Sequence, residues 1–222
     1  MKDLTWSWIG RVPYRQALDD QHQRRDAVIN GEEKEIIWML EHEPVITTGR
    51  RSVPGLVSKE HLLKYGIDQV QTERGGLATY HGPGQLIAYP IIDCWERGMG
   101  ARGAVHAMEQ SVIDWLDSLR IQAVRRPGFP GVWVKGNKIC AIGMHFKKGV
   151  SIHGIAINLS DQLEGFNFIT PCGITDAGIT SVHREGGLDI TAETAAPLLA
   201  THIVRNLLHP TCTMKTRSPS TG

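Results

Sequence analysis

The middle of the chain carries the pattern that most constrains the fold. Gly131-Val-Trp-Val134 and Lys138-Ile-Cys-Ala-Ile-Gly-Met144 flank Lys135-Gly-Asn137, a tripeptide typical of a hairpin turn. Residues 150–158 alternate apolar with small or polar side chains, which is the pattern of the next strand. Two consecutive hairpins beside the apolar run at 85–92 predict an antiparallel or mixed sheet.

Helical patterns on both sides of this region predict helices that pack on the sheet. Apolar residues recur at helical spacing between 104 and 120. A second helix is expected over 192–208, with Thr191 as its N-cap and Pro197 tolerable only near the first turn. The charged segment 14–30 is a third candidate. Together these elements predict an α+β fold, a mixed or antiparallel sheet packed with helices.

Length and charge limit the classes of protein that the chain can belong to. Its 222 residues contain no internal linker, so we expect one domain over residues 1–210 and a disordered tail at 211–222. The formal charge of +1 argues against nucleic-acid binding, and the short clusters Arg125-Arg126 and Lys147-Lys148 are typical of solvated surface.

The N-terminus has an early acidic residue and no apolar segment of signal-peptide length, and no run reaches the roughly 20 apolar residues of a membrane span. We therefore expect a cytoplasmic protein without membrane contact. Four scattered cysteines show no Cys-x-x-Cys spacing, which predicts free thiols, no bound metal and no cofactor: Cys94, Cys140, Cys172 and Cys212.

A thiol with an ammonium partner is the chemistry that the sequence suggests. Cys172 lies in Thr-Pro-Cys-Gly-Ile, where Pro171 fixes its own φ and Gly173 permits close approach of a ligand. Lys138 lies in Gly-Asn-Lys-Ile-Cys, and a nearby cation lowers the pKa of a thiol and so favours the nucleophilic thiolate. The alternatives are that Lys138 is a solvated residue beside a turn and that Cys172 is a small buried hydrophobe.

Cys140 is a rival nucleophile. It lies two residues from Lys138, so on a regular strand both side chains point to one face, roughly 7 Å apart. That position commits the thiol to a packed sheet face. Spacing alone does not choose between Cys140 and Cys172.

The glycine-rich stretch from Arg74 to Gln85 has the chemistry of a cradle for an acyl group or a phosphopantetheine arm. Glycines let the main chain approach a ligand and present N–H donors, and Arg74 supplies positive charge. Turns use the same residues, and the stretch matches neither the P-loop nor the dinucleotide pattern. The glycines concerned are Gly75, Gly76, Gly82 and Gly84.

Nearby histidines and aliphatic residues have two interpretations each. His81, His145 and His153 are either general acids or bases at neutral pH or structural histidines that donate to the backbone. Four aliphatic residues either line a slot for an acyl chain or belong to the core: Leu86, Ile87, Ile142 and Ile155.

Taken with Lys138, Cys172 and the segment His153-Gly-Ile-Ala-Ile-Asn158, the stretch 74–92 resembles the octanoyltransferase family of lipoate biosynthesis. The resemblance covers roughly residues 35 to 190. It implies a core shared with biotin and lipoate protein ligases, of the class II synthetase type. It also implies transfer of an octanoyl group from acyl carrier protein to a lysine of lipoyl domains, those of 2-oxoacid dehydrogenases and of the glycine cleavage H protein.

The resemblance also assigns site residues. It places the nucleophile at Cys172, which holds the octanoyl group as a thioester, and makes Lys138 the thiolate partner and the base, with no need for ATP. The implied substrate-binding residues are Arg74, Gly75, Gly76, Leu77, Ala78, Thr79, Tyr80, His81, Ala141, Ile142, Gly143, Gly154, Ile155 and Ala156.

Two other functions remain open at this point. An ATP-dependent lipoate or biotin ligase would share the fold, although no lysine is clearly suited to hold an adenylate and a Pro-Cys-Gly thiol would have no role. A non-catalytic module that binds acyl carrier protein or a lipoyl domain would not need both Lys138 and Cys172.

Overall fold

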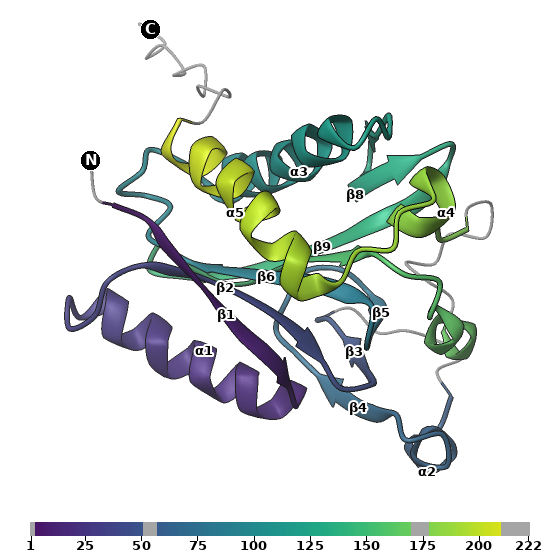
Figure 1. Cartoon of the computed structure of the whole chain (residues 1–222). Coiled ribbons are helices and arrows are strands. Elements are labelled where there is room, and N and C mark those ends of the chain that lie inside the picture. Colours follow the sequence, from purple (N-terminus) through teal and green to yellow (C-terminus); the bar gives the residue numbers. More distant parts are fainter. Residues whose placement is uncertain (1–2, 51–56, 170–177, 210–222) are drawn as a thin grey trace, which may run out of the picture.

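A seven-stranded mixed sheet forms the centre of the molecule (Figure 1). The computed structural model describes residues 3–50, 57–169 and 178–209. Only the pair β1–β2 is parallel among the strand pairs of this sheet in the described residues. The order is β1 (Thr5–Val12), β2 (Ile36–His42), β6 (Gln85–Ile91), β10 (Val150–Asn158), β9 (Asn137–Lys147), β8 (Phe129–Val134) and β7 (Val124–Arg126).

A smaller sheet of three strands lies beside the first: β4 (Asp68–Gln71), β3 (Val45–Thr48) and β5 (Ala78–His81). β5 falls inside the glycine-rich stretch that the sequence suggested to be a loop. Its four residues are all buried and pair antiparallel with β3. The stretch is therefore a strand between two glycine-containing turns, because pairing with the distant β3 satisfies its backbone.

The two hairpins predicted between 131 and 158 are confirmed, with one local difference. Lys135 and Gly136 both have positive φ, 48° and 83°, as a two-residue type I′ turn requires. Val132 pairs with Cys140 but Trp133 pairs with Lys138, so β9 has one extra residue at this point. Such a bulge interrupts the alternation of side chains. The expectation that Lys138 and Cys140 share one face is therefore wrong: Cys140 is buried in the core, whereas Lys138 is half-buried.

The three predicted helices are confirmed as α1 (Tyr14–Ile29), α3 (Ala101–Ser118) and α5 (Ala192–Leu208). α1 packs on β10 and β6, and α3 and α5 pack together on the opposite face of the sheet (Figure 1). Three short elements complete the description: α2 (Lys59–Leu63), α4 (Val182–Gly186) and the 3-10 helix η1 (Glu164–Phe168). None of the described helices combines the length and the apolar composition needed to span a bilayer.

The start of α5 differs in one detail from its prediction. Thr191 is the N-cap, and its side chain forms a capping box with Thr194. Pro197, however, is the sixth residue of the helix and so lies in the second turn rather than the first. Its ring is on the exposed side of the helix, where water can bond the carbonyl that loses its partner.

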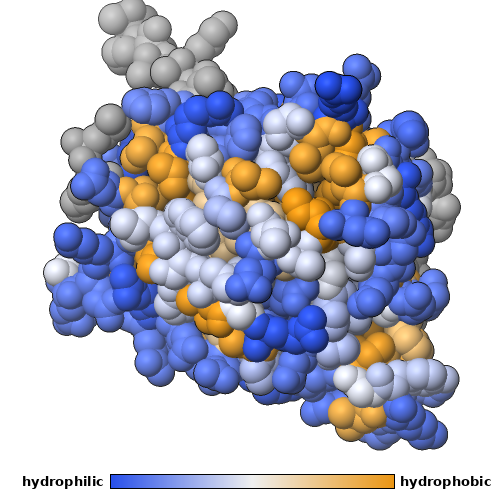
Figure 2. All heavy atoms as spheres, viewed as in Figure 1, coloured by the Kyte–Doolittle hydropathy of each residue, from blue (hydrophilic) through white to orange (hydrophobic). Residues whose placement is uncertain are grey.

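The main core lies between the large sheet and the pair α3–α5. Trp115 and Met108 of α3 and Leu199 of α5 are almost completely buried against strand residues such as Met39 and Ile157. Burial of each such side chain contributes roughly 1.5–3 kcal/mol. On the face seen in Figure 2, apolar side chains form separated patches in a hydrophilic surface, one of them at α2, where Leu63 is 55% exposed.

Two glycine substitutions test the packing. A Cβ on Gly154 would clash with the backbone carbonyl of Ala88, whereas a Cβ on Gly103 in α3 would meet only ordinary contacts with Met99. We expect Gly154→Ala to lower the free energy of unfolding by more than about 2 kcal/mol. Gly103→Ala should raise it by about 0.5–1 kcal/mol. Urea unfolding of both variants checks this, and equal effects would contradict the described contact between β6 and β10.

Candidate active site

A large pocket opens where the glycine-rich segment, the hairpin β9–β10 and the first half of α3 meet. Its volume is about 1130 Å³. One wall is the segment 74–79, which leads into β5, and the floor is formed by residues 141–144 and 153–156 of the two hairpin strands. The opposite wall consists of α3 and residues 125–130 between β7 and β8.

The structure brings most of the predicted site residues together around this pocket. Tyr80 instead packs edge-on against Phe166 of η1, with ring centroids 5.5 Å apart, in a separate small core. Cys172 lies outside the described residues. The predicted residues that line the pocket are Lys138, Arg74, Gly75, Gly76, Leu77, Ala78, Thr79, His81, Ala141, Ile142, Gly143, Gly154, Ile155 and Ala156.

Small residues let the glycine-rich segment lie directly on the sheet. Gly143 pairs with Gly154 across β9 and β10. The N–H of Gly75 donates to the carbonyl of Met144 at 3.2 Å. A Cβ on Gly143 would lie 2.8 Å from the carbonyl oxygen of Gly75. The contact between the two backbones therefore requires glycine.

Arg74 braces this segment. Its side chain is buried, and Nη2 donates to the carbonyl and to the hydroxyl of Thr47 at 2.7 and 2.8 Å, while Nη1 donates to the carbonyl of Gly75 at 3.0 Å. Buried guanidinium groups need such partners, because an unsatisfied charge in the interior is costly. Arg74 thus ties the pocket wall to β3.

Lys138 lies at the edge of the pocket, next to the chain that follows the Cys172 segment. Its Nζ donates to the carbonyl of Pro130 at 3.1 Å and lies 4.8 Å from the centre of the Trp133 ring. Its backbone N–H donates to Gly178, and its carbonyl accepts from Thr180, both at 3.0 Å. The ammonium group is thus held in place by contacts that a fully solvated lysine would lack.

Cys140 is in a different environment. It is 1% exposed in the main core, and burial raises the pKa of its thiol. Burial also raises the pKa of Cys94 to about 12. Since only the thiolate is strongly nucleophilic, both cysteines are in inert surroundings.

The predicted histidines are buried to different degrees and are neutral near pH 7. Burial lowers the pKa of His81 well below its ordinary value, and the ring contacts the side-chain oxygen of Gln85 at 3.2 Å rather than backbone. Burial also lowers the pKa of His153, which is fully buried, and of His145, which is partly exposed. Burial therefore favours the neutral imidazole at His81 and His153, which line this end of the pocket.

Sequence reasoning missed two aromatic residues at the inner end of the pocket. Tyr14 of α1 stacks on His81, with ring centroids 5.9 Å apart and planes at 6°. Tyr89 of β6 contacts His42 through its hydroxyl at 2.8 Å. Both tyrosines line the pocket. No pattern in the sequence connects them, because they come from elements far apart along the chain.

The opposite wall also contains residues that the sequence suggested to be ordinary surface. Arg125 and Arg126 line the pocket, and so does Glu109 of α3. Glu109 accepts from Arg125 Nε at 3.0 Å and from the N–H of Gly131 at 2.8 Å. The ion pair joins α3 to β7, and the hydrogen bond to Gly131 joins α3 to β8. Among the described residues, no three His, Cys, Asp or Glu side chains are placed to hold a metal ion.

Comparisons with known proteins agree on one family. A sequence model of the lipoyl protein ligase A/B catalytic domain matches residues 13–204. An octanoyltransferase of Alkaliphilus metalliredigens is 41% identical over 79% of this chain and 82% of its own length. An octanoyltransferase of Chloroflexus aurantiacus is 40% identical over 90% of this chain and 92% of its own.

Solved structures show the same fold at lower identity. A lipoate protein ligase of Thermoplasma acidophilum superposes with a TM-score of 0.68 at 18% identity, over 92% of this chain and 82% of its own. A lipoate-protein ligase A bound with ATP superposes with a TM-score of 0.67 at 17% identity, over 92% of this chain and 84% of its own. The biotin protein ligase of Aquifex aeolicus superposes with a TM-score of 0.53 at 14% identity, over 93% of this chain and 68% of its own. The expected relation of the fold to lipoate and biotin ligases is confirmed.

The buried histidine behind the pocket should make stability depend on pH. His42 Nδ1 donates to the carbonyl of Val12 at 3.0 Å, and burial lowers the pKa of the ring to about 4. The unfolded chain therefore binds the proton first, so the free energy of unfolding should fall as the pH falls from about 6.5 to 4. In His42→Gln, the free energy of unfolding should depend less steeply on pH, by up to about 1.4 kcal/mol per pH unit. Urea unfolding between pH 4 and 7 measures it, and identical slopes would contradict the prediction.

Proposed function

The chain belongs to the family of lipoyl protein ligase A/B catalytic domains and transfers an octanoyl group in protein lipoylation, and we propose that the group passes through a thioester on Cys172. The observation that carries this mechanism is the position of Lys138. It lines the pocket, and its backbone pairs with Gly178 and Thr180. Gly178 follows Cys172 by six residues, which span at most about 20 Å, so the chain length permits the thiol to approach Lys138.

In the first half-reaction, the thiolate of Cys172 attacks the carbonyl carbon of the octanoyl thioester of the donor. The new C–S bond forms as the bond to the donor sulfur breaks, and that sulfur takes a proton from the Lys138 ammonium and leaves as a thiol, so that Lys138 becomes a neutral amine. The ammonium of Lys138 stabilises the attacking thiolate. Backbone N–H groups around Cys172 are the proposed donors to the oxygen that gains charge in the tetrahedral intermediate.

In the second half-reaction, the amine of the acceptor lysine attacks the thioester on Cys172. An amide forms, the Cys172 sulfur leaves as a thiolate, and the amine proton passes to Lys138 acting as the base. Because an amide is more stable than a thioester, the exchange needs no ATP. The apolar wall of Leu77, Ile142 and Ile155 suits the eight-carbon chain.

Charge around the pocket supports an acidic carrier protein as the donor. The residues that line the pocket include six cationic side chains and one carboxylate, Glu109, although the whole chain has a formal charge of only +1. A concentration of positive charge attracts an acidic partner and a phosphate-bearing arm. We propose octanoyl acyl carrier protein as donor and the lipoyl domains of 2-oxoacid dehydrogenases and the glycine cleavage H protein as acceptors. The cationic residues are Arg50, Arg74, Arg102, Arg125, Arg126 and Lys138.

The alternatives considered from the sequence have weaker support. The ATP-dependent ligases share the fold at 14–18% identity, whereas relatives that are 40–41% identical over most of the chain are octanoyltransferases. That identity also favours an enzyme over a silent binding module. The buried position of Cys140 removes it as the nucleophile that would have competed with Cys172.

The covalent intermediate can be tested directly. Incubation with octanoyl acyl carrier protein, without ATP, should give an adduct on Cys172 that intact-protein and peptide mass spectrometry detect. Cys172→Ser should abolish the thioester adduct and lower kcat/KM by roughly 10³-fold or more. Cys140→Ala should retain most of both, because Cys140 is buried and has a raised pKa. Equal loss in the two variants would contradict the assignment.

The two roles of Lys138 are separable by substitution. Lys138→Ala should raise the thiol pKa of Cys172, because the positive charge is removed, and slow acylation. Lys138→Arg restores the charge but not the base, since guanidinium stays protonated. In the arginine variant, Cys172 should be acylated faster than in the alanine variant, but the octanoyl group should still pass slowly to the acceptor lysine. Single-turnover rates of both steps across pH measure this, and unchanged thiol reactivity in both variants would exclude Lys138 as the partner.

A further inference from the structure

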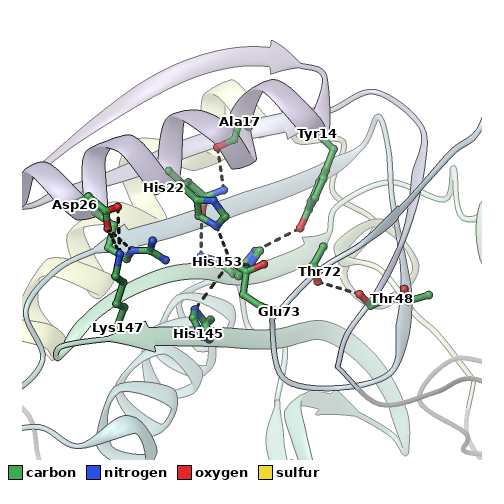
Figure 3. A network of polar contacts seen from close by, with 12 residues as sticks. Tyr14, Ala17, His22, Asp26, Thr48, Thr72, Glu73, His145, Lys147 and His153 are labelled. Carbon is green, nitrogen blue, oxygen red and sulfur yellow. Dashed lines mark hydrogen bonds and ion pairs between the residues drawn. The ribbon is translucent and has the colours of Figure 1, made fainter.

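An unusual cluster of titratable groups surrounds the carboxylate of Glu73 (Figure 3). Its Oε1 lies 2.5 Å from Nε2 of His22 on α1. The same oxygen lies 3.8 Å from Nε2 of His153 on β10 and 4.0 Å from Nδ1 of His145 on β9. Glu73 therefore contacts three elements, and it directly precedes the pocket wall that begins at Arg74.

His153 is held in a strained conformation within this cluster. Its φ is +57°, a value that non-glycine residues rarely adopt in a strand. Its N–H donates to Oε1 of Gln21 at 2.8 Å, and its Nδ1 lies 3.3 Å from the hydroxyl of Tyr14. The side chain is 2% exposed, and Nε2 is buried without a hydrogen-bond partner among the described residues. Strain of this kind persists only where the surroundings fix the residue.

The neighbours of His153 favour one tautomer. A carboxylate only accepts hydrogen bonds, so the nitrogen that faces Glu73 is best protonated, and Nδ1 is then free to accept from Tyr14. The separation of 3.8 Å is an ion-pair distance, longer than a hydrogen bond, so Glu73 acts on the ring through its charge. The nearby His153 and His22 side chains and the backbone N–H of Glu73 hold the pKa of Glu73 well below its usual range, which keeps that charge at neutral pH.

The hydroxyl of Tyr14 extends this effect into the pocket. Tyr14 is buried and stacks on His81, and both rings line the inner end of the pocket. The orientation of the Tyr14 ring thus depends on the hydrogen bond of its hydroxyl, whose partner is His153. Glu73 is connected to the pocket by one side chain, His153, and by the backbone that continues into Arg74.

We propose that Glu73 is a positioning residue for the acyl pocket. Its carboxylate selects the His153 tautomer that accepts the Tyr14 hydroxyl, and so fixes the Tyr14 and His81 rings that close the inner end of the slot. This proposal rests on the proposed function, because the slot is the binding site of the octanoyl chain. Loss of the charge releases the rings and weakens binding of the acyl donor, while the thiol chemistry near Lys138 is left intact.

The tautomer is measurable without turnover. In the full chain labelled with ¹⁵N-histidine, ring-nitrogen shifts at pH 7.5 should show His153 protonated on Nε2, with assignment from the signal lost in His153→Gln. Glu73→Leu should give a mixture of tautomers. Glu73→Gln should give a similar mixture because the amide carries no charge, whereas Glu73→Asp should keep the Nε2–H form because the carboxylate charge remains. The matched control is Asp19→Asn on the exposed side of α1, which should leave the His153 signals unchanged. An unchanged His153 tautomer in Glu73→Leu would overturn the proposal.

Kinetics distinguish positioning from a merely structural role. With octanoyl-N-acetylcysteamine, a small donor without carrier protein, Glu73→Leu should raise KM roughly tenfold, about 1.4 kcal/mol, with less than about a twofold change in the rate of Cys172 acylation at saturation. Glu73→Asp, which keeps the charge, should recover most of the affinity. A joint loss of kcat, affinity and Tm would show that Glu73 only supports the fold. Absence of any Cys172 adduct in the unsubstituted protein would instead contradict the proposed function, and the tautomer result would stand independently.

Discussion

The close approach of two backbones at Gly143 and Gly154 is the constraint on which the pocket depends. The two glycines pair across β9 and β10; the glycine-rich segment rests on Gly143 through Gly75, and Gly154 lies against the backbone of β6. Side chains at these positions would meet the carbonyls of Gly75 and Ala88. Since those atoms are backbone, no change of rotamer could relieve the contact, and the wall would be lifted from the floor. The pocket can form because three segments, each from a different part of the fold, have glycine at this place: Gly75, Gly143 and Gly154.

Burial then divides this pocket into two chemical environments. Its inner end contains Tyr14, His81 and His153, whose burial favours the neutral forms of the rings. The outer wall contains arginines and Lys138, near the solvent, with Glu109 as the balancing carboxylate. An inner end lined by neutral rings suits a hydrocarbon chain, and a cationic rim suits the acidic carrier that we propose as donor. The two halves of a bound donor therefore match the two environments.

The bulge in β9 places the Cys140 thiol in the core, away from the pocket. One extra residue between Lys138 and Cys140 breaks the alternation, so that Ile139 and Cys140 are both buried in the core. Lys138 stays at the pocket edge, where its backbone holds the segment that begins at Gly178. The electrostatic attraction of an ammonium two residues from a thiol is thereby outweighed by the cost of a buried thiolate, and the pKa of Cys140 is raised.

The sequence by itself determined most of the secondary-structure elements and a part of the residues that line the pocket. Local patterns sufficed for the hairpins, the three long helices and the Thr191 cap, because periodicity and turn chemistry act over a few residues. The Lys138 motif and the glycines were equally visible. Only the tertiary structure decided that residues 78–81 form a strand, that Arg74 binds Thr47, and that Glu73 contacts three histidines. These outcomes depend on contacts between distant segments, such as Tyr14 with His153, and on burial, which sets ionisation; neither is encoded in local spacing.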